Sequence, residues 1–137
     1  MYAQGWIGMP VEQIPTPALV VDVEKLDRNL ATMADYLARV KTNIRPHAKT
    51  PKTPAIGHRQ MRAGAVGLCC ATVGEAEVMA YSGIPEVMIA NEVVDPLSVR
   101  RAVNLARQAR VLMIVDDPQN VRDIGETARQ YGSTVDV

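Results

Sequence analysis

Phenylalanine is absent from this chain of 137 residues, and aromatic residues make up only 4% of it. The core must therefore be built from valine, isoleucine, leucine, methionine and alanine, which suits a parallel sheet covered by helices. Hydrophobic residues make up 47% of the chain and charged residues 22%, as in ordinary globular proteins. The length is sufficient for one domain with a substantial core.

Net charge is lacking as well, since the formal charge at pH 7 is zero. No basic tail or lysine-arginine block is present, so we expect neither a nucleic-acid partner nor an anionic membrane surface. No apolar run approaches the roughly 18 residues that a membrane-spanning helix needs. The opening residues, MYAQGW, lack the basic and apolar regions of a secretory signal, so the cytoplasm is the expected location.

Cysteine is scarce, and Cys69 and Cys70 stand next to each other in an apolar run. Neighbouring residues of a strand point to opposite faces, so a disulfide between them would be strained and a shared metal site is disfavoured. We expect two buried, inert thiols. His47 and His58 share no ligand spacing with a cysteine or a carboxylate, so the sequence predicts no metal site.

Strand-like and helical patterns alternate along the chain. Apolar runs that predict strands begin near residues 43, 67, 87, 111 and 134, and helices are expected at 54–63, 72–81, 95–109 and 117–131. Residues 1–15 predict an irregular lead-in, and residues 18–21 a further short strand. Asp22 is expected to cap a helix that packs into the core through Leu26, Leu30, Met33, Leu37 and Val40.

This regular alternation predicts an α/β fold with a parallel sheet and right-handed crossovers. Two architectures fit: a doubly wound five-stranded sheet, and the first half of a (βα)8 barrel, which needs about 250 residues. The chain ends within an apolar strand, without a turn, a cap or a polar tail. We therefore favour the barrel, with residues 16–137 as its amino-terminal portion, truncated at the fifth barrel strand.

Residues 44–52 hold the side chains best suited to chemistry. As a strand, this stretch places Arg45, His47 and Lys49 on one face, where three basic groups are expensive to bury. A lysine beside other cations loses part of its preference for the protonated form, which is how an amine becomes a nucleophile. From chemistry alone, two interpretations stay open: a Schiff-base lysine at the opening of a site, and an exposed basic edge strand.

The sequence of residues 45–52, RPHAKTPK, resembles the cofactor-lysine segment of the D-threonine aldolase and D-serine dehydratase-like family. There the segment usually runs arginine, proline, histidine, any residue, lysine, any residue, histidine, lysine, so Pro51 replaces a second histidine. Residues 16–22 and 67–77 are also similar to the family, whose glutamine after the cysteine pair is Ala71 here. The resemblance covers nearly the whole chain from Thr16 onward.

The resemblance implies a pyridoxal-phosphate (PLP) enzyme with the alanine-racemase type of barrel, acting on a D-β-hydroxy amino acid. It implies that Lys49 holds PLP as a Schiff base and that His47 is a proton-transfer or cofactor-orienting group. Arg45 and Thr72 are expected to contact the cofactor, Arg45 as an electrostatic partner within the barrel. The family also implies a homodimer at full length, and a phosphate cradle and divalent metal whose ligands are absent from this chain. The short strand at 18–21 would belong to a second domain.

Several activities are compatible with this resemblance. D-threonine or 3-hydroxy-D-aspartate aldolase cleavage and D-serine dehydratase-type deamination differ in which bond breaks, and these residues do not decide between them. Racemisation would need a second base from residues that are absent here, and a non-catalytic PLP carrier is a further alternative. We expect the isolated chain to be inactive, since half a barrel leaves open sheet edges and an uncovered apolar interior.

Overall fold

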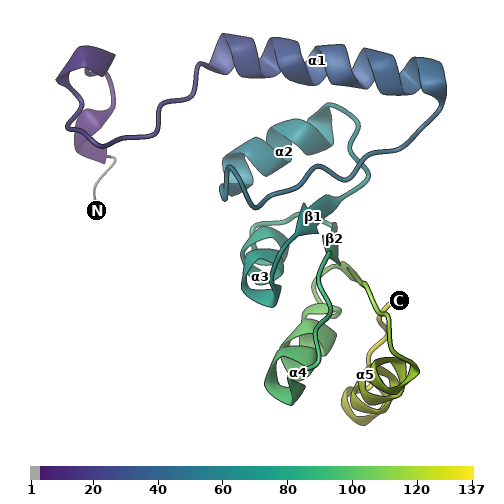
Figure 1. The fold of residues 1–137 in the computed structure, drawn as a ribbon. Coiled ribbons are helices and arrows are strands. Elements are labelled where there is room, and N and C mark those ends of the chain that lie inside the picture. The colour runs from purple at the N-terminus through teal and green to yellow at the C-terminus, as the bar shows by residue number, and fades with distance from the viewer. Residues whose placement is uncertain (1–3) are drawn as a thin grey trace.

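The computed structural model describes residues 4–137 as an alternation of helices and strands that follows a short lead-in (Figure 1). The elements are the 3-10 helices η1 (Gln4–Trp6) and η2 (Val11–Gln13), then α1 (Val23–Val40), α2 (Pro54–Arg62), β1 (Leu68–Cys70), α3 (Val73–Tyr81), β2 (Glu86–Ile89), α4 (Pro96–Leu105), β3 (Arg110–Met113) and α5 (Pro118–Tyr131). None of the helices in this part of the chain is long and apolar enough to cross a membrane.

The helices begin where the sequence predicts them, because their caps are local. Asp22 accepts a hydrogen bond from the backbone N–H of Lys25 at 3.0 Å, and Asp95 and Asp117 cap α4 and α5 in the same way. One end is wrong: α4 stops at Leu105 instead of near residue 109. Three successive backbone hydrogen bonds, each joining residues three apart, form tight turns over residues 103–108 at the end of α4.

The sheet is parallel throughout and its strands lie in chain order, β1-β2-β3. On either side one further residue pairs in parallel, His47 with Cys69 and Asp136 with Leu112. All five predicted barrel strands thus occupy neighbouring positions, although the outer two are reduced to single bridges. A doubly wound sheet reverses its strand order at a switch point, so sequential order favours the barrel.

The two faces of the sheet differ in what covers them. Alternate strand residues, among them Leu68, Val87 and Val111, are fully buried against α3, α4 and α5 in one apolar core. The residues between them, such as Met88 and Leu112, are only partly buried and lie outside this core. Helices on one face and an open second face are what a barrel wall requires, with the open face as its interior. The predicted fold class is confirmed.

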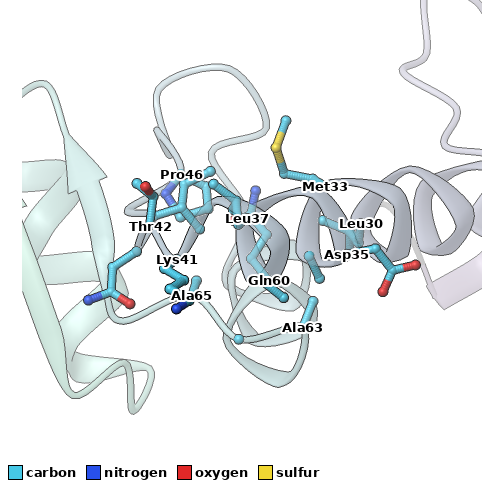
Figure 2. Close-up of a pocket in the computed structure, with 15 residues that line it drawn as sticks. Leu30, Met33, Asp35, Leu37, Lys41, Thr42, Pro46, Gln60, Ala63 and Ala65 are labelled. Atoms are coloured by element: carbon cyan, nitrogen blue, oxygen red, sulfur yellow. The ribbon is translucent and has the colours of Figure 1, made fainter.

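Helix α1 stands apart from this core. It has no buried residue, and Met33 and Val40 are each 47% exposed, so the predicted packing of its apolar face into the core is wrong. The reason is geometric: a groove of about 600 Å³ separates it from α2 and residues 41–46 (Figure 2). The predicted strand at 18–21 is also wrong for this structure, since it pairs with no strand among residues 4–137 and Leu19 is fully exposed.

Candidate active site

Lys49 follows the extended segment that pairs with β1 at one edge of the sheet. It lies at the carboxyl end of the strands, where parallel barrels have their functional side chains. The backbone N–H of Ala48 donates to the carbonyl of Cys69 at 2.7 Å, and Ala48 itself is buried in the core. The N–H of Lys52 then donates to the carbonyl of Ala48 at 2.9 Å, which closes residues 48–52 into a turn. We call this segment the lysine turn. Lys49 is therefore exposed on a turn whose start is fixed to β1.

The predicted strand thus ends earlier than expected. The bridge of His47 to Cys69 confirms extended pairing there, but Lys49 lies in the turn that follows. Among residues 4–137, the Lys49 ammonium makes no salt bridge that would occupy it. Its amine is free to meet a ligand at this end of the sheet.

His47 contacts the lysine turn directly. Its Nδ1 accepts the backbone N–H of Lys49 at 3.2 Å. A neutral imidazole with an accepting Nδ1 carries its proton on Nε2, so the second nitrogen is the donor. His47 and Lys49 are thus in contact through a side chain and a backbone N–H, while the proton-transfer or cofactor-orienting role of His47 stays a prediction.

The residues that follow β1 and β2 at the carboxyl edge of the sheet are small. Cys70 and Ile89 are partners in the sheet, and the N–H of Ala90 donates to the carbonyl of Cys70 at 2.8 Å. Ala71 and Ala90 therefore follow the ends of adjacent strands, and alternation places both on the interior side. Short side chains at the same edge of the sheet as Lys49, and an amine that no salt bridge occupies within the described residues, are compatible with PLP attached to Lys49.

Thr72 caps α3, as the sequence predicts, with its hydroxyl oxygen accepting the N–H of Glu75 at 3.1 Å. In a standard capping box the Glu75 carboxylate would accept the backbone N–H of Thr72, but here its two oxygens bind other groups. One oxygen accepts the N–H of Ala71 at 2.8 Å, and the other is bonded to the Lys52 ammonium. The Thr72-x-x-Glu75 spacing is typical of a capping box and is the one signal of Glu75 in the sequence; its bonds to Lys52 and Ala71 have no such signal.

The surroundings of Glu75 lower its pKa below the usual value. The hydrogen bond from Lys52 is the largest cause, followed by that from the Ala71 N–H, and burial opposes both. The positive charges of Lys52 and His47 add smaller contributions of the same sign as these hydrogen bonds. The ionised carboxylate is therefore the stable form in the folded chain.

This pKa shift predicts a pH dependence of stability. A carboxylate whose pKa is lowered by folding stabilises the protein above its ordinary value of 4.5, and that contribution is lost as the pH falls through the folded-state value. We expect Glu75→Gln to flatten the fall in unfolding free energy between about pH 5 and pH 3. Denaturant unfolding of both proteins across this range is the measurement, and parallel curves for the two would contradict it.

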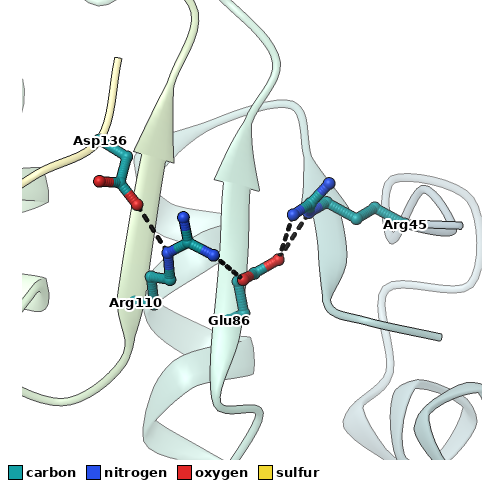
Figure 3. A network of polar contacts seen from close by, with 4 residues as sticks. All are labelled: Arg45, Glu86, Arg110 and Asp136. Atoms are coloured by element: carbon teal, nitrogen blue, oxygen red, sulfur yellow. Dashed lines mark hydrogen bonds and ion pairs between the residues drawn. The ribbon is translucent and has the colours of Figure 1, made fainter. Parts of the chain in front are cut away.

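Arg45 lies at the other end of the strands. Its Nε donates to Oε1 of Glu86 at 2.6 Å, and Oε2 of Glu86 accepts from Arg110 at 2.9 Å (Figure 3). Arg110 in turn donates to Asp136 at 2.6 Å. Glu86 is the first residue of β2, so this ion row crosses the sheet at its amino edge. The expected electrostatic partnership of Arg45 is present, but its guanidinium is not brought together with Lys49 and Thr72.

Gly67 is what lets the ion row close. It stands between Arg45 and Glu86 in the sheet register, and a Cβ there would lie 2.8 Å from the carbonyl oxygen of Glu86 and 2.9 Å from its Oε1. The Glu86 carbonyl belongs to the sheet backbone and cannot move away from an added Cβ as the end of a flexible side chain could. Only glycine at this position permits the approach of the two charged side chains.

We expect Gly67→Ala to lower the free energy of unfolding by about 1–3 kcal/mol, because the added methyl group overpacks the sheet and displaces Glu86. Gly74→Ala is the matched control, since the atom nearest to its new Cβ would be 3.8 Å away. Denaturant titration measures both. Equal stabilities of the two variants would show that Gly67 is not sterically required.

The two cysteines are free and buried, as expected. Burial raises the pKa of Cys70 to about 12 and also raises that of Cys69, which the charges of Lys49 and Arg45 oppose. Raised values keep both thiols protonated and inert near neutral pH. Within residues 4–137, no three histidine, cysteine or acidic side chains gather as metal ligands.

Residues 21–137 match the family described as alanine racemase, N-terminal domain. The chain is 37% identical over 130 residues to a D-threonine aldolase of Arthrobacter sp, which covers 95% of this chain and 34% of the relative. It is 36% identical over 132 residues to a 3-hydroxy-D-aspartate aldolase of Paracoccus denitrificans, with coverages of 95% and 34%.

Solved structures are similar over the same region. The D-threonine aldolase from Filomicrobium marinum superposes with a TM-score of 0.88 at 46% identity, covering 91% of this chain and 34% of that one. D-threo-3-hydroxyaspartate dehydratase from Delftia sp. HT23 gives a TM-score of 0.81 at 29% identity, with coverages of 90% and 32%. The chain thus spans about a third of the length of the proteins it matches.

Proposed function

Because the chain belongs to the alanine racemase N-terminal domain family, we propose that it supplies the cofactor lysine of a PLP-dependent lyase acting on D-β-hydroxy amino acids. The observation that carries this proposal is Lys49, exposed on a turn that is fixed to β1 at the carboxyl edge of the sheet. Two aldolases among the relatives support the substrate class. That it is the amino-terminal part of such an enzyme is part of the proposal, supported by its match to an N-terminal domain family and by its share of about a third of the relatives' length.

The three residues near the carboxyl edge of the sheet have different roles in this proposal. Nζ of Lys49 is the atom that holds the cofactor covalently, through its aldehyde carbon and with loss of water. His47 holds the lysine turn through Nδ1 and presents its Nε2 proton to the site. Thr72 caps α3 beside the site and can donate its hydroxyl proton to a ligand. When bound, PLP supplies the electron sink that makes bonds to the substrate α-carbon breakable.

The proposal places the phosphate cradle and the metal site outside the described residues. A phosphate group needs a cradle of backbone N–H groups, commonly in a glycine-rich loop, and residues 4–137 contain no such loop. We place the phosphate cradle and the divalent-metal site that the resemblance implies in segments beyond these residues. The isolated chain is therefore expected to be catalytically inactive. A homodimer and a cytoplasmic location are further predictions for the longer enzyme.

A chimaera tests the proposal. Residues 16–137 replace the matching third of the Filomicrobium marinum D-threonine aldolase, whose structure this chain superposes on closely. With PLP and a divalent metal, D-threonine is expected to yield glycine and acetaldehyde. A folded, PLP-loaded chimaera that releases neither product would contradict the proposed lyase function of this segment.

Dehydration is the second candidate, favoured by the similarity to the Delftia dehydratase. The same assay separates the two, because loss of water from D-threonine gives ammonia and a keto acid in place of glycine and acetaldehyde. Formation of L-allo-threonine, the product of inversion at the α-carbon alone, would indicate racemisation. PLP binding without turnover would indicate a carrier function.

A further inference from the structure

The lysine turn is conformationally costly at its last residue. Lys52 has φ = 47°, which places a side chain with a Cβ in the left-handed region. This conformation is unfavourable for a residue other than glycine. Such a residue persists only where its surroundings hold it, and residues of this kind cluster at functional sites. Lys52 must therefore be held by contacts outside the turn.

The contact that holds Lys52 comes from α3. The Lys52 ammonium is bonded to Oε1 of Glu75, whose side chain is only 14% exposed, while Lys52 is 63% exposed. The other oxygen of the same carboxylate accepts the N–H of Ala71, the residue that follows β1. One carboxylate therefore connects the end of the lysine turn to the end of the neighbouring strand.

The connection fixes Lys49 from both sides. The turn is joined to the sheet at its start through Ala48, and to α3 at its end through Lys52 and Glu75. Lys49 lies between these two attachments along the chain, and the Glu75 carboxylate at the second of them also accepts the Ala71 N–H. Loss of either member of the ion pair frees one end of the turn while the first attachment is retained.

We propose that Lys52 and Glu75 are positioning residues for Lys49, holding its amine at the carboxyl edge of the sheet, where the cofactor would bind. This inference rests on the proposed function, in which Lys49 carries PLP. It adds two residues that do not themselves contact the reacting atoms. Accurate placement of a reacting group is worth large rate factors, and a displacement of about 1 Å can cost up to 100-fold.

The test uses the chain as part of the chimaera with the Filomicrobium marinum D-threonine aldolase, so that the segments in which we place the phosphate cradle are present, and PLP is the probe. PLP is added, the C=N bond that forms is reduced with borohydride at timed intervals, and peptide mapping gives the labelling rate at each lysine. Visible circular dichroism of the chromophore on Lys49 reports whether it is held in one orientation. The variants are Glu75→Gln, Lys52→Met and the charge-preserving Lys52→Arg.

We expect Glu75→Gln and Lys52→Met to slow labelling of Lys49 about fivefold or more and to weaken the visible dichroism. Labelling at the distant Lys25 and Lys41 is expected to stay unchanged, and Lys52→Arg to remain within about twofold of the parent. The control is Glu77→Gln, which removes a comparable ion pair, with Arg101, from the same helix without touching the lysine turn. It is expected to label as the parent does.

The outcomes separate the two proposals. If the parent chimaera labels Lys49 no faster than Lys25 or Lys41, the proposed function itself fails. If the parent labels Lys49 selectively and both Glu75→Gln and Lys52→Met do so at the same rate with the same dichroism, the positioning role is wrong. Should Glu75→Gln also lower the unfolding temperature, Lys52→Met decides, since it leaves the Glu75 bond to Ala71 intact.

Discussion

In the chimaera with D-threonine aldolase, Lys49→Ala is expected to lower turnover of D-threonine by about 1000-fold or more. Lys49 lies at the carboxyl end of the sheet, and its ammonium makes no salt bridge within residues 4–137. In the proposed function its amine is the group that attaches the cofactor. Of the other lysines of this segment, Lys52 is bonded to Glu75 and Lys25 to Asp22.

Chemical rescue gives this prediction its control. Methylamine supplied in solution can replace a missing lysine amine but not a missing fold, so partial recovery of turnover is expected in the Lys49→Ala chimaera. Lys25→Ala, which removes an exposed lysine from α1, is expected to leave turnover unchanged. Turnover in Lys49→Ala equal to that of the parent chimaera would rule out Lys49 as the cofactor lysine.

Glu86→Ala is expected to cause the largest loss of stability, about 2–3 kcal/mol of unfolding free energy. Glu86 is 8% exposed and accepts hydrogen bonds from both Arg45 and Arg110. Its removal leaves two guanidinium groups facing each other across β2 without the charge between them. Breaking a buried pair costs about 3–5 kcal/mol, and the exposure of Arg110 reduces that figure here.

Denaturant unfolding measures this loss, with Glu77→Ala as the comparison. Glu77 also pairs with an arginine, but on the surface between α3 and α4, where an ion pair contributes little. The two carboxylates differ mainly in burial and in the number of arginines that they join. If Glu77→Ala destabilised the chain as much as Glu86→Ala, the ion row would have no special importance for the fold.

The sequence predicts the helices because their ends are marked by neighbouring residues. Asp22, Thr72, Asp95 and Asp117 each accept a backbone N–H within three residues, and such bonds are visible in the order of residues alone. The parallel sheet is predictable for a similar reason, since apolar strands recur at regular intervals. Local chemistry therefore accounts for most of the fold.

What the sequence does not reveal depends on pairs that are distant along the chain. Arg45 meets Glu86 across 41 residues, and Lys52 meets Glu75 across 23. No periodicity marks such partners, so Arg45 is predicted at the cofactor while the structure places its guanidinium at the opposite edge of the sheet. The exposure of α1 is hidden for the same reason, because an amphipathic pattern predicts a buried face but not the element that covers it.

Peptide mapping of the borohydride-reduced complex of PLP with the chimaera shows directly which lysine of this segment carries the cofactor. We expect the label to appear first and predominantly on Lys49, ahead of Lys25, Lys41 and Lys52. Label distributed evenly over the four lysines, or concentrated on one of the other three, would contradict the assignment of Lys49 as the cofactor lysine.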